Sequence, residues 1–404
     1  MEVVYTHGCG IDVHKRSVSV CVLVPGSSGE GVVKQVRQYG TTVAELLEMQ
    51  DWLKECGVRQ VAMESTGVYW KPVWNILETE FEVILVNAAH VKNVPGRKTD
   101  KADCSWIANL LRHGLLQASF VPSAAIRQLR DLCRSRTKLV QQKAAVANRI
   151  QKVLEDANVK LASVATDVLG MSGRKILKQI IAGEQDPHQL SQLALGRLRN
   201  KREQLEQALA GRVSGHHRFL LKQYLEQVEF LEGQIAVFQA EIQRQLPPFA
   251  VADLPGIDEV AAAALRAEIG ADMDQFPSAR HLVSWARLCP GNHESAGKRL
   301  SGKTRPGNPW LRGLMVQVAW AASHTKDTYL AAQYRRLAHR RGRKRALIAL
   351  ANSLLSITWY LLKHQQPYQD LGADYFDRLQ GPSQRYYIQQ LQKMGFRVVL
   401  EPVA

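Results

Sequence analysis

The amino-acid sequence predicts an α/β domain followed by two mainly helical regions. Three observations lead to this fold class. Short β-branched runs alternate with helical patterns only as far as about residue 120. Residues 121–247 carry apolar side chains at helical spacing, and residues 248–404 combine further helices with a long stretch rich in Gly, Ser, Lys and Arg. A chain of 404 residues exceeds one typical core, so we expect three domains: 1–120, 121–247 and 248–404.

The first domain is predicted to begin with three strands joined by short turns, followed by strand–helix units. In chain order we expect strands at 8–14, 17–24 and 32–39, a helix at 42–55, a strand at 58–64, a helix at 70–80, a strand at 82–87 and a helix ending near 113. Three antiparallel strands followed by such units form the ribonuclease-H-like arrangement. Ligands of such sheets gather at the carboxyl ends of the strands.

Four carboxylates follow this pattern. Asp12 closes the first predicted strand and Glu64 the fourth, while Asp100 and Asp103 precede the last helix, spaced to share one helix face. Each alone has a structural explanation, as a turn residue, a helix cap or an acid in a first helical turn. Together, at consistent ends of one sheet, they indicate a site for hard divalent cations such as Mg²⁺.

The middle region is predicted to contain two long helices, at 124–156 and 217–245, with shorter helices at 173–182 and 187–210 between them. The apolar residues of the second long helix come close to a heptad repeat. The pair is therefore expected to form an antiparallel arm or a coiled coil between subunits, and an ordinary helical bundle is the alternative.

The C-terminal region is predicted to form helices at 259–268 and 276–288, then a 20-residue loop from 289 to 308. Asn308 is expected to cap the next helix, with Pro309 at its first position. Long loops inside compact domains are often functional, and small residues with cations suit contact with phosphates. The alternative is a disordered basic loop that binds RNA or DNA and takes no part in catalysis. The tail after about residue 365 fits no recognised pattern.

The charge of the chain indicates a polyanionic partner. The formal net charge is +16, and residues 291–345 hold 13 Lys or Arg against two acids. Nucleic acid is the leading candidate, although a general RNA-binding role would explain the charge equally well.

Cysteine usage and hydropathy predict a cytoplasmic protein. The six cysteines are scattered without a Cys-x-x-Cys pair, which favours a reducing compartment over a zinc site or a disulfide framework. We find no apolar run of about 18 residues and no signal-peptide pattern, so no membrane span is predicted.

Four short motifs follow one another along the chain: Gly-Ile-Asp-Val-His-Lys at 10–15, Met-Glu-Ser-Thr-Gly at 63–67, Lys-Thr-Asp-Lys-Ala-Asp at 98–103 and Glu-Ser-Ala-Gly-Lys at 294–298. Together, in this order, they resemble the transposases of insertion-sequence family 110, including its 1111 subgroup. The resemblance implies a RuvC-like N-terminal domain in which Asp12, Glu64, Asp100 and Asp103 bind Mg²⁺. It also implies a C-terminal serine, Ser295, that forms a 5′-phosphoserine link to DNA. Ser301, in a second Ser-Gly-Lys, is the other candidate.

The resemblance further implies a multimer, a dimer or a tetramer, that acts on donor and target DNA under the guidance of a structured RNA from the element's noncoding end. Cations near the motifs are the candidate nucleic-acid ligands: Lys98, Lys101, Lys298, Arg299, Lys303, Arg305 and Arg312. Two alternatives stay open. One is a RuvC-like nuclease or junction resolvase without a covalent step, and the other is a non-catalytic nucleic-acid-binding protein.

Overall fold

The computed structural model describes residues 3–26, 31–65, 67–87, 91, 103–245, 251, 253–291, 293–304, 307–378 and 384–399. The chain divides into two compact units, Met1–Pro122 and Ser123–Ala404. The division into three domains stays a prediction.

The first unit is built on a five-stranded mixed sheet. Its strands are β1 (Gly8–Val13), β2 (Val18–Pro25), β3 (Val32–Tyr39), β4 (Gln60–Glu64) and β5 (Glu82–Val86). They lie in the order β3-β2-β1-β4-β5. The first three strands pair antiparallel, while β4 and β5 run parallel to β1. The predicted succession of elements and the mixed sheet are confirmed.

Helices cover both faces of this sheet. On one face lie α1 (Val43–Glu55) and α2 (Trp70–Leu77), whose apolar residues share a buried cluster with Ile11 and Met63. On the other face lies α4 (Asp103–Arg112), which shares a cluster with Ala62 of β4. Because side chains alternate along a strand, β4 and β5 each contribute to both clusters.

Gly10 lets α4 lie directly on β1. A Cβ atom at this position would stand 2.1 Å from the carbonyl oxygen of Cys104 and 2.3 Å from the backbone nitrogen of Ala108. Both atoms belong to the backbone of α4, so no side-chain rearrangement could make room. Any other residue at position 10 would push α4 off the sheet.

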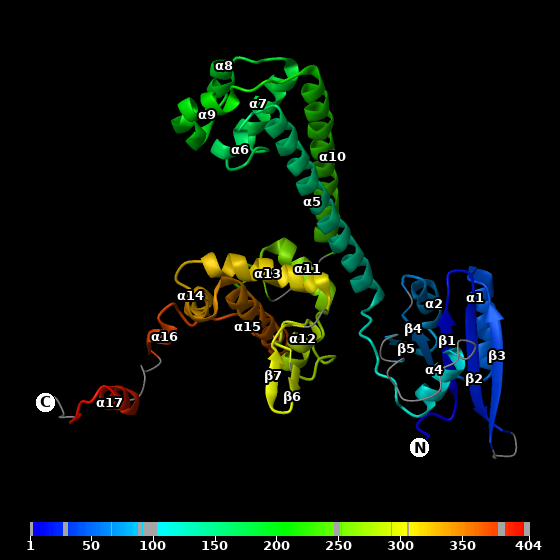
Figure 1. The fold of residues 1–404 in the computed structure, drawn as a ribbon. Helices are drawn as coiled ribbons and strands as arrows, with labels where there is room; N and C mark the ends of the chain where they lie inside the picture. Colours follow the sequence, from blue (N-terminus) through cyan, green and yellow to red (C-terminus); the bar gives the residue numbers. More distant parts are fainter. Residues whose placement is uncertain are drawn as a thin grey trace. The chain divides into compact units, whose positions relative to one another are not determined.

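Two long helices form an arm in the second unit, α5 (Ala124–Asp156) and α10 (Gly215–Gln245), which lie side by side (Figure 1). Both were predicted to within two residues. Their association in a coiled coil between subunits stays a prediction.

Short helices fill the tip of the arm. They are α6 (Leu161–Val164), α7 (Met171–Ala182), α8 (Pro187–Gln192), a 3₁₀ helix (Gly196–Lys201) and α9 (Arg202–Leu209). The prediction of one continuous helix over 187–210 was wrong. Gly196, with φ of 56°, lies in the left-handed region and interrupts it.

The rest of the second unit is a helical body around one apolar core. Its elements are α11 (Glu259–Ile269), α12 (Ala279–Trp285), β6 (His293–Ser295), β7 (Lys298–Ser301), α13 (Pro309–His324), α14 (Tyr329–Arg341) and α15 (Arg343–His364), followed by α16 (Tyr375–Arg378) and α17 (Gln384–Lys393). In length and composition α15 could cross a membrane. However, Leu350, Ala351 and Leu354 are fully buried in the core of this body, so α15 serves as a core helix.

The segment from 289 to 308 is not a loop throughout, which corrects the sequence-based expectation. β6 and β7 pair antiparallel and form a hairpin within it. Asn308 caps α13 as predicted: its side-chain oxygen accepts hydrogen bonds from the backbone N–H groups of Trp310 and Leu311, and Pro309 is the first helical residue.

Candidate active site and the serine hairpin

Asp12 and Glu64 lie at the same edge of the sheet and on the same face. β1 pairs with β4 in parallel, with Ile11 opposite Met63, so the next residue of each strand places Asp12 beside Glu64. Gly10 faces α4, and side chains two residues apart point to the same side, so Asp12 also faces the α4 side. Glu64 also faces the α4 side, because Ala62, two residues earlier in β4, packs against α4.

Asp103 is the third carboxylate at this edge. It is the first residue of α4 and is half-buried. The neighbouring Cys104 carbonyl lies over Gly10, two residues before Asp12, so the first turn of α4 lies close to the end of β1. The fold therefore places three of the four predicted carboxylates at the same edge of the sheet. Asp100 lies outside the described residues, as do Lys98 and Lys101.

His14 is a site residue that the sequence analysis did not select. Its Nε2 lies 3.1 Å from Oδ2 of Asp12, whose side chain is only 15% exposed, while that of His14 is 61% exposed. The spacing of two residues at a strand end could have indicated this pair, since such residues share a face. When protonated, His14 forms an ion pair with Asp12 and competes with a cation for this carboxylate.

The donor set has the chemistry of a hard-cation site. Asp12, Glu64 and Asp103 offer only carboxylate oxygens, the ligands that Mg²⁺ prefers. Within the part of the chain that the structure describes, no three His, Cys, Asp or Glu side chains lie close enough to hold one ion. The described carboxylates therefore share an edge of the sheet without closing around one ion. The fourth carboxylate, Asp100, falls outside the described residues.

Cysteines next to the carboxylates are not the nucleophile. Cys21 and Cys104 are buried between the sheet and α4. Burial raises the pKa of both thiols, and Asp12 adds a small contribution at Cys104. Both thiols are therefore protonated at neutral pH, and the thiol is a far weaker nucleophile than the thiolate.

Ser295 lies at the end of a tight hairpin, next to a cation. It is the last residue of β6 and pairs directly with Lys298, the first residue of β7. Ala296 and Gly297 connect them with φ of 48° and 72°, the left-handed pattern of a two-residue turn. Both Ser295 and Lys298 are exposed, and side chains of directly opposite residues lie about 5 Å apart at Cβ. A hydroxyl and an ammonium group are thus presented together to solvent.

The other candidate residues occupy the same part of the second unit. Ser301 ends β7, and its Oγ accepts a hydrogen bond from the backbone N–H of Lys303, with 3.2 Å between N and O. Lys303 is exposed and Arg312 is half-buried on α13. Arg299 stands opposite Glu294 in the hairpin, and Arg305 lies outside the described residues.

A buried ionic cluster fixes the segment that follows the hairpin. Glu268, at the end of α11, is 3% exposed. It accepts two hydrogen bonds from Arg134 of α5, at 2.7 and 2.9 Å, and one from the Asn308 side chain at 2.6 Å. Arg130 donates to the backbone carbonyls of Ala267 and Glu268. The base of the arm, α11 and the cap of α13 therefore meet at one carboxylate.

Replacing Glu268 with alanine is expected to lower the free energy of unfolding of the second unit by about 3 kcal/mol, because it leaves Arg134 and Arg130 without their buried counter-charge. Urea unfolding measures this change. Glu259→Ala is the matched control, since Glu259 is exposed on the same helix and the expected change is within about 0.5 kcal/mol. Equal effects of the two substitutions would contradict a stabilising role for the cluster.

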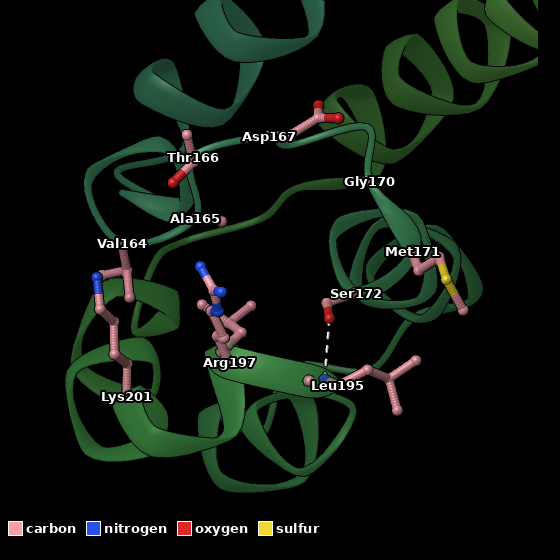
Figure 2. A pocket seen from close by; sticks show the side chains of 12 residues that line it. Val164, Ala165, Thr166, Asp167, Gly170, Met171, Ser172, Leu195, Arg197 and Lys201 are labelled. Atoms are coloured by element: carbon pink, nitrogen blue, oxygen red, sulfur yellow. Dashed lines mark hydrogen bonds between the residues drawn. The ribbon is translucent and has the colours of Figure 1, made fainter. Parts of the chain in front are cut away.

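A pocket of about 450 Å³ lies at the tip of the arm (Figure 2). Arg197 and Lys201 line one side and Asp167 another, and Ser172 accepts a hydrogen bond from the backbone N–H of Leu195, at 2.9 Å. None of the predicted site residues lines it. It lies among the short helices at the arm tip of the second unit, and the β6–β7 hairpin of the same unit does not contribute to it.

Comparison with known proteins agrees with this architecture. A DEDD transposase model of IS110 elements matches residues 9–159, and the model of the transposase IS116/IS110/IS902 family matches residues 250–335. The transposase for insertion sequence element IS1111A of Coxiella burnetii is 26% identical over 376 residues, covering 89% of this chain and 90% of the relative. A probable family 20 transposase of Pseudomonas aeruginosa is 25% identical over 333 residues, which cover 80% of this chain and 89% of the relative.

The mixed sheet and the DEDD match define the first unit as a RuvC-like DEDD transposase domain. The two matched regions together cover more than half of the chain, and the chain belongs to the IS110 family of insertion-sequence transposases. Membership implies DNA as the substrate and phosphoryl transfer as the chemistry, and the DEDD domain suggests dependence on a divalent metal. The family that the four motifs indicated is confirmed.

Proposed function

We propose that this protein cuts and rejoins DNA during transposition of its insertion sequence, with Ser295 as the nucleophile and Mg²⁺ held by Asp12, Glu64, Asp100 and Asp103. The observation that supports this most directly is the gathering of Asp12, Glu64 and Asp103 at one edge and one face of the sheet. An acidic sheet edge in a chain of charge +16 suits a metal-dependent reaction on a polyanion.

In the proposed cleavage step, the Ser295 oxygen attacks the scissile phosphorus. The bond from phosphorus to the 3′ oxygen breaks, and that oxygen leaves as a 3′ hydroxyl. The proton it takes up balances the proton that the serine hydroxyl releases to solvent. The 5′ phosphate stays on the serine, and rejoining reverses the step with a new 3′ hydroxyl. A serine hydroxyl needs activation at neutral pH. Bound Mg²⁺ would supply positive charge at the phosphate oxygens and lower the cost of deprotonating the hydroxyl.

The cations of the hairpin have a defined task in this scheme. Lys298, opposite Ser295, and Arg299 would stabilise the negative charge that develops on the pentavalent phosphate. We assign the remaining predicted cations, Lys98, Lys101, Lys303, Arg305 and Arg312, to the nucleic-acid backbone. The carboxylates and the serine belong to different units, so the reaction requires that the two be brought together.

A denaturing gel tests the covalent step directly. Incubation of the protein with labelled DNA and Mg²⁺ is expected to leave protein attached to a DNA 5′ end. Cleaved DNA free of protein would instead identify a nuclease that uses metal-activated water. Salt-dependent binding with no cleavage in Mg²⁺ would identify a non-catalytic nucleic-acid-binding protein.

We further propose that a structured RNA from the element's noncoding end guides the protein to donor and target DNA in the cytoplasm. The experiment is to sequence the RNA that copurifies with the protein and then to measure recombination with and without it. Recombination at full rate in the absence of any RNA would contradict the proposal.

The arm offers a surface for a homo-oligomer, which we propose is a dimer or a tetramer. Phe219, Phe230 and Val237 of α10 are 63%, 64% and 63% exposed. Their spacings of eleven and seven residues are close to whole helical turns, so they form one stripe. Leu221 and Leu225 of the same helix belong to the buried core of the arm. α10 thus carries a second set of apolar side chains outside the core of the arm, and this set is exposed in the single chain.

The double substitution F230S/V237S is expected to weaken self-association by about tenfold or more, because apolar anchors carry most of the energy of an interface. Light scattering of the eluting protein at several concentrations measures the effect. The control is V43S/V68S, which replaces two valines of the first unit that are 67% and 65% exposed. An unchanged mass for F230S/V237S would rule out this stripe as the interface.

A further inference from the structure

The junction of α14 and α15 carries a dense group of cations outside the predicted site. We call it the basic junction. Its seven members are Arg335, Arg336, Arg340, Arg341, Arg343, Lys344 and Arg345. All seven are exposed, and the sequence contains no Asp or Glu from 328 to 369. Positive charge is therefore concentrated here with no acid of the same segment to balance it.

These cations are not neutralised within the described part of the chain. None of the seven forms an ion pair there, and only Arg336 has a ring contact, at 5.0 Å from the centre of Phe376. Arg336 and Arg340 are four residues apart on α14, where like charges repel. Arg343 begins α15, and cations are unfavourable at a helix N-terminus. The arrangement opposes folding unless an anionic partner offsets it.

The cations are held on a rigid support. α14 ends and α15 begins at a single residue, Gly342, whose φ of 82° makes the turn without a loop. Leu330 of α14 and Leu350 of α15 are fully buried in the shared core. A preformed surface of fixed charge binds a polyanion at a lower entropic cost than a flexible basic tail does.

We propose that the basic junction binds the phosphate backbone of duplex DNA. Proteins that hold single strands combine cations with aromatic platforms for stacking, and no Phe, Tyr or Trp occurs from 335 to 345. The pattern suits backbone contacts instead, which position a duplex without reading its sequence. DNA is the duplex that the activity of the family requires.

The junction belongs to the same packed helical body as the segment that enters the serine hairpin. The Asn352 side chain of α15 donates a hydrogen bond to the backbone carbonyl of Leu288, at 3.5 Å. Asn352 lies seven residues beyond Arg345, or about 10 Å along the helix axis. That distance is well within one turn of duplex DNA, about 34 Å. A duplex bound at the junction would thus be held by the body that carries Ser295.

The test measures binding of a 30-base-pair duplex without element sequence, by fluorescence anisotropy across a salt series. All proteins carry Ser295→Ala so that no covalent step interferes, which separates this test from that of the proposed nucleophile. The junction variant is R340Q/R341Q/K344Q/R345Q. The matched control, R149Q/K152Q/K175Q/R199Q, removes the same charge from four exposed positions on the arm.

The junction variant is expected to bind the DNA duplex at least about tenfold more weakly. The slope of log affinity against log salt is expected to fall by about 3.6, since each of the four lost phosphate contacts contributes about 0.9. Its thermal midpoint is expected to stay equal or to rise, because charge repulsion is relieved. R340K/R341K/R345K, which keeps the charge, is expected to retain the slope.

Three results would overturn the proposal. An equal loss of affinity for duplex DNA in the arm control would mean that only the net charge of the protein determines binding. A greater loss with duplex RNA or single strands than with duplex DNA would assign the junction to another nucleic acid. A loss of slope in the lysine variant would show that charge is not the cause.

Discussion

Replacing Ser295 with alanine is expected to abolish covalent attachment to DNA and to reduce recombination by at least about a thousandfold, the scale seen when a nucleophile is removed. Ser295 and its cross-strand partner Lys298 are exposed at the end of the β6–β7 hairpin. Alanine keeps the backbone and removes only the attacking oxygen. The measurement is the amount of protein-linked DNA on a denaturing gel, together with product formed in a recombination assay.

Ser301→Ala is the matched control for this substitution. Ser301 lies on the other strand of the same hairpin, is also exposed, and its Oγ only accepts a hydrogen bond from the Lys303 backbone. Loss of the Ser301 hydroxyl is expected to leave the covalent attachment of the protein to DNA intact. The opposite result, with Ser301→Ala inactive and Ser295→Ala active, would transfer the role to Ser301. Activity in both variants would rule out a serine link from this hairpin.

Asp12→Asn is expected to reduce strand cleavage by at least about a hundredfold, because a metal ion contributes several kcal/mol and about 1.4 kcal/mol corresponds to a factor of ten. The substitution preserves shape and removes one negative charge from the edge where Glu64 and Asp103 also lie. Cleavage is measured over a Mg²⁺ series, and removal of the metal with a chelator is expected to abolish it in the wild type. Calorimetric titration with Mn²⁺ is expected to show weakened binding.

Asp51→Asn is the control for the metal site. Asp51 is exposed on α1, the helix on the opposite face of the same sheet. Asp51→Asn removes one negative charge from the first unit, as Asp12→Asn does, but on the face of the sheet away from α4. If Asp12→Asn cut DNA at the wild-type rate in Mg²⁺, the four carboxylates would not form the metal site.

Sequence patterns were sufficient where local rules govern the structure. The alternation of β-branched residues located the strands that end near Asp12 and Glu64, since successive side chains of a strand point to opposite faces of the sheet. The apolar spacing located α5 and α10, and the Asn308-Pro309 pair located the start of α13. These features depend on residues within a few positions of each other.

Patterns failed for one short hairpin, for one side-chain pair at a strand end, and where distant segments meet. The β6–β7 hairpin was predicted as loop, because its two strands are only three and four residues long and Ala296 is an unusual residue for a left-handed turn. The approach of His14 to Asp12 and the burial of Glu268 between Arg134 and Asn308 were also not predicted. Residues that meet across 40 or 134 positions leave no periodic signal in the chain.

The sequence by itself determined the family, because four motifs occur in the expected order. It also identified the acids and the serine that are to be tested. Only the tertiary structure decided that Asp12 and Glu64 share one face with the start of α4. The reason is that parallel pairing of β1 with β4, and the space that Gly10 leaves for the α4 backbone, bring together segments more than 50 residues apart. Chain order supplies the carboxylates, whereas strand register and helix packing decide which of them meet.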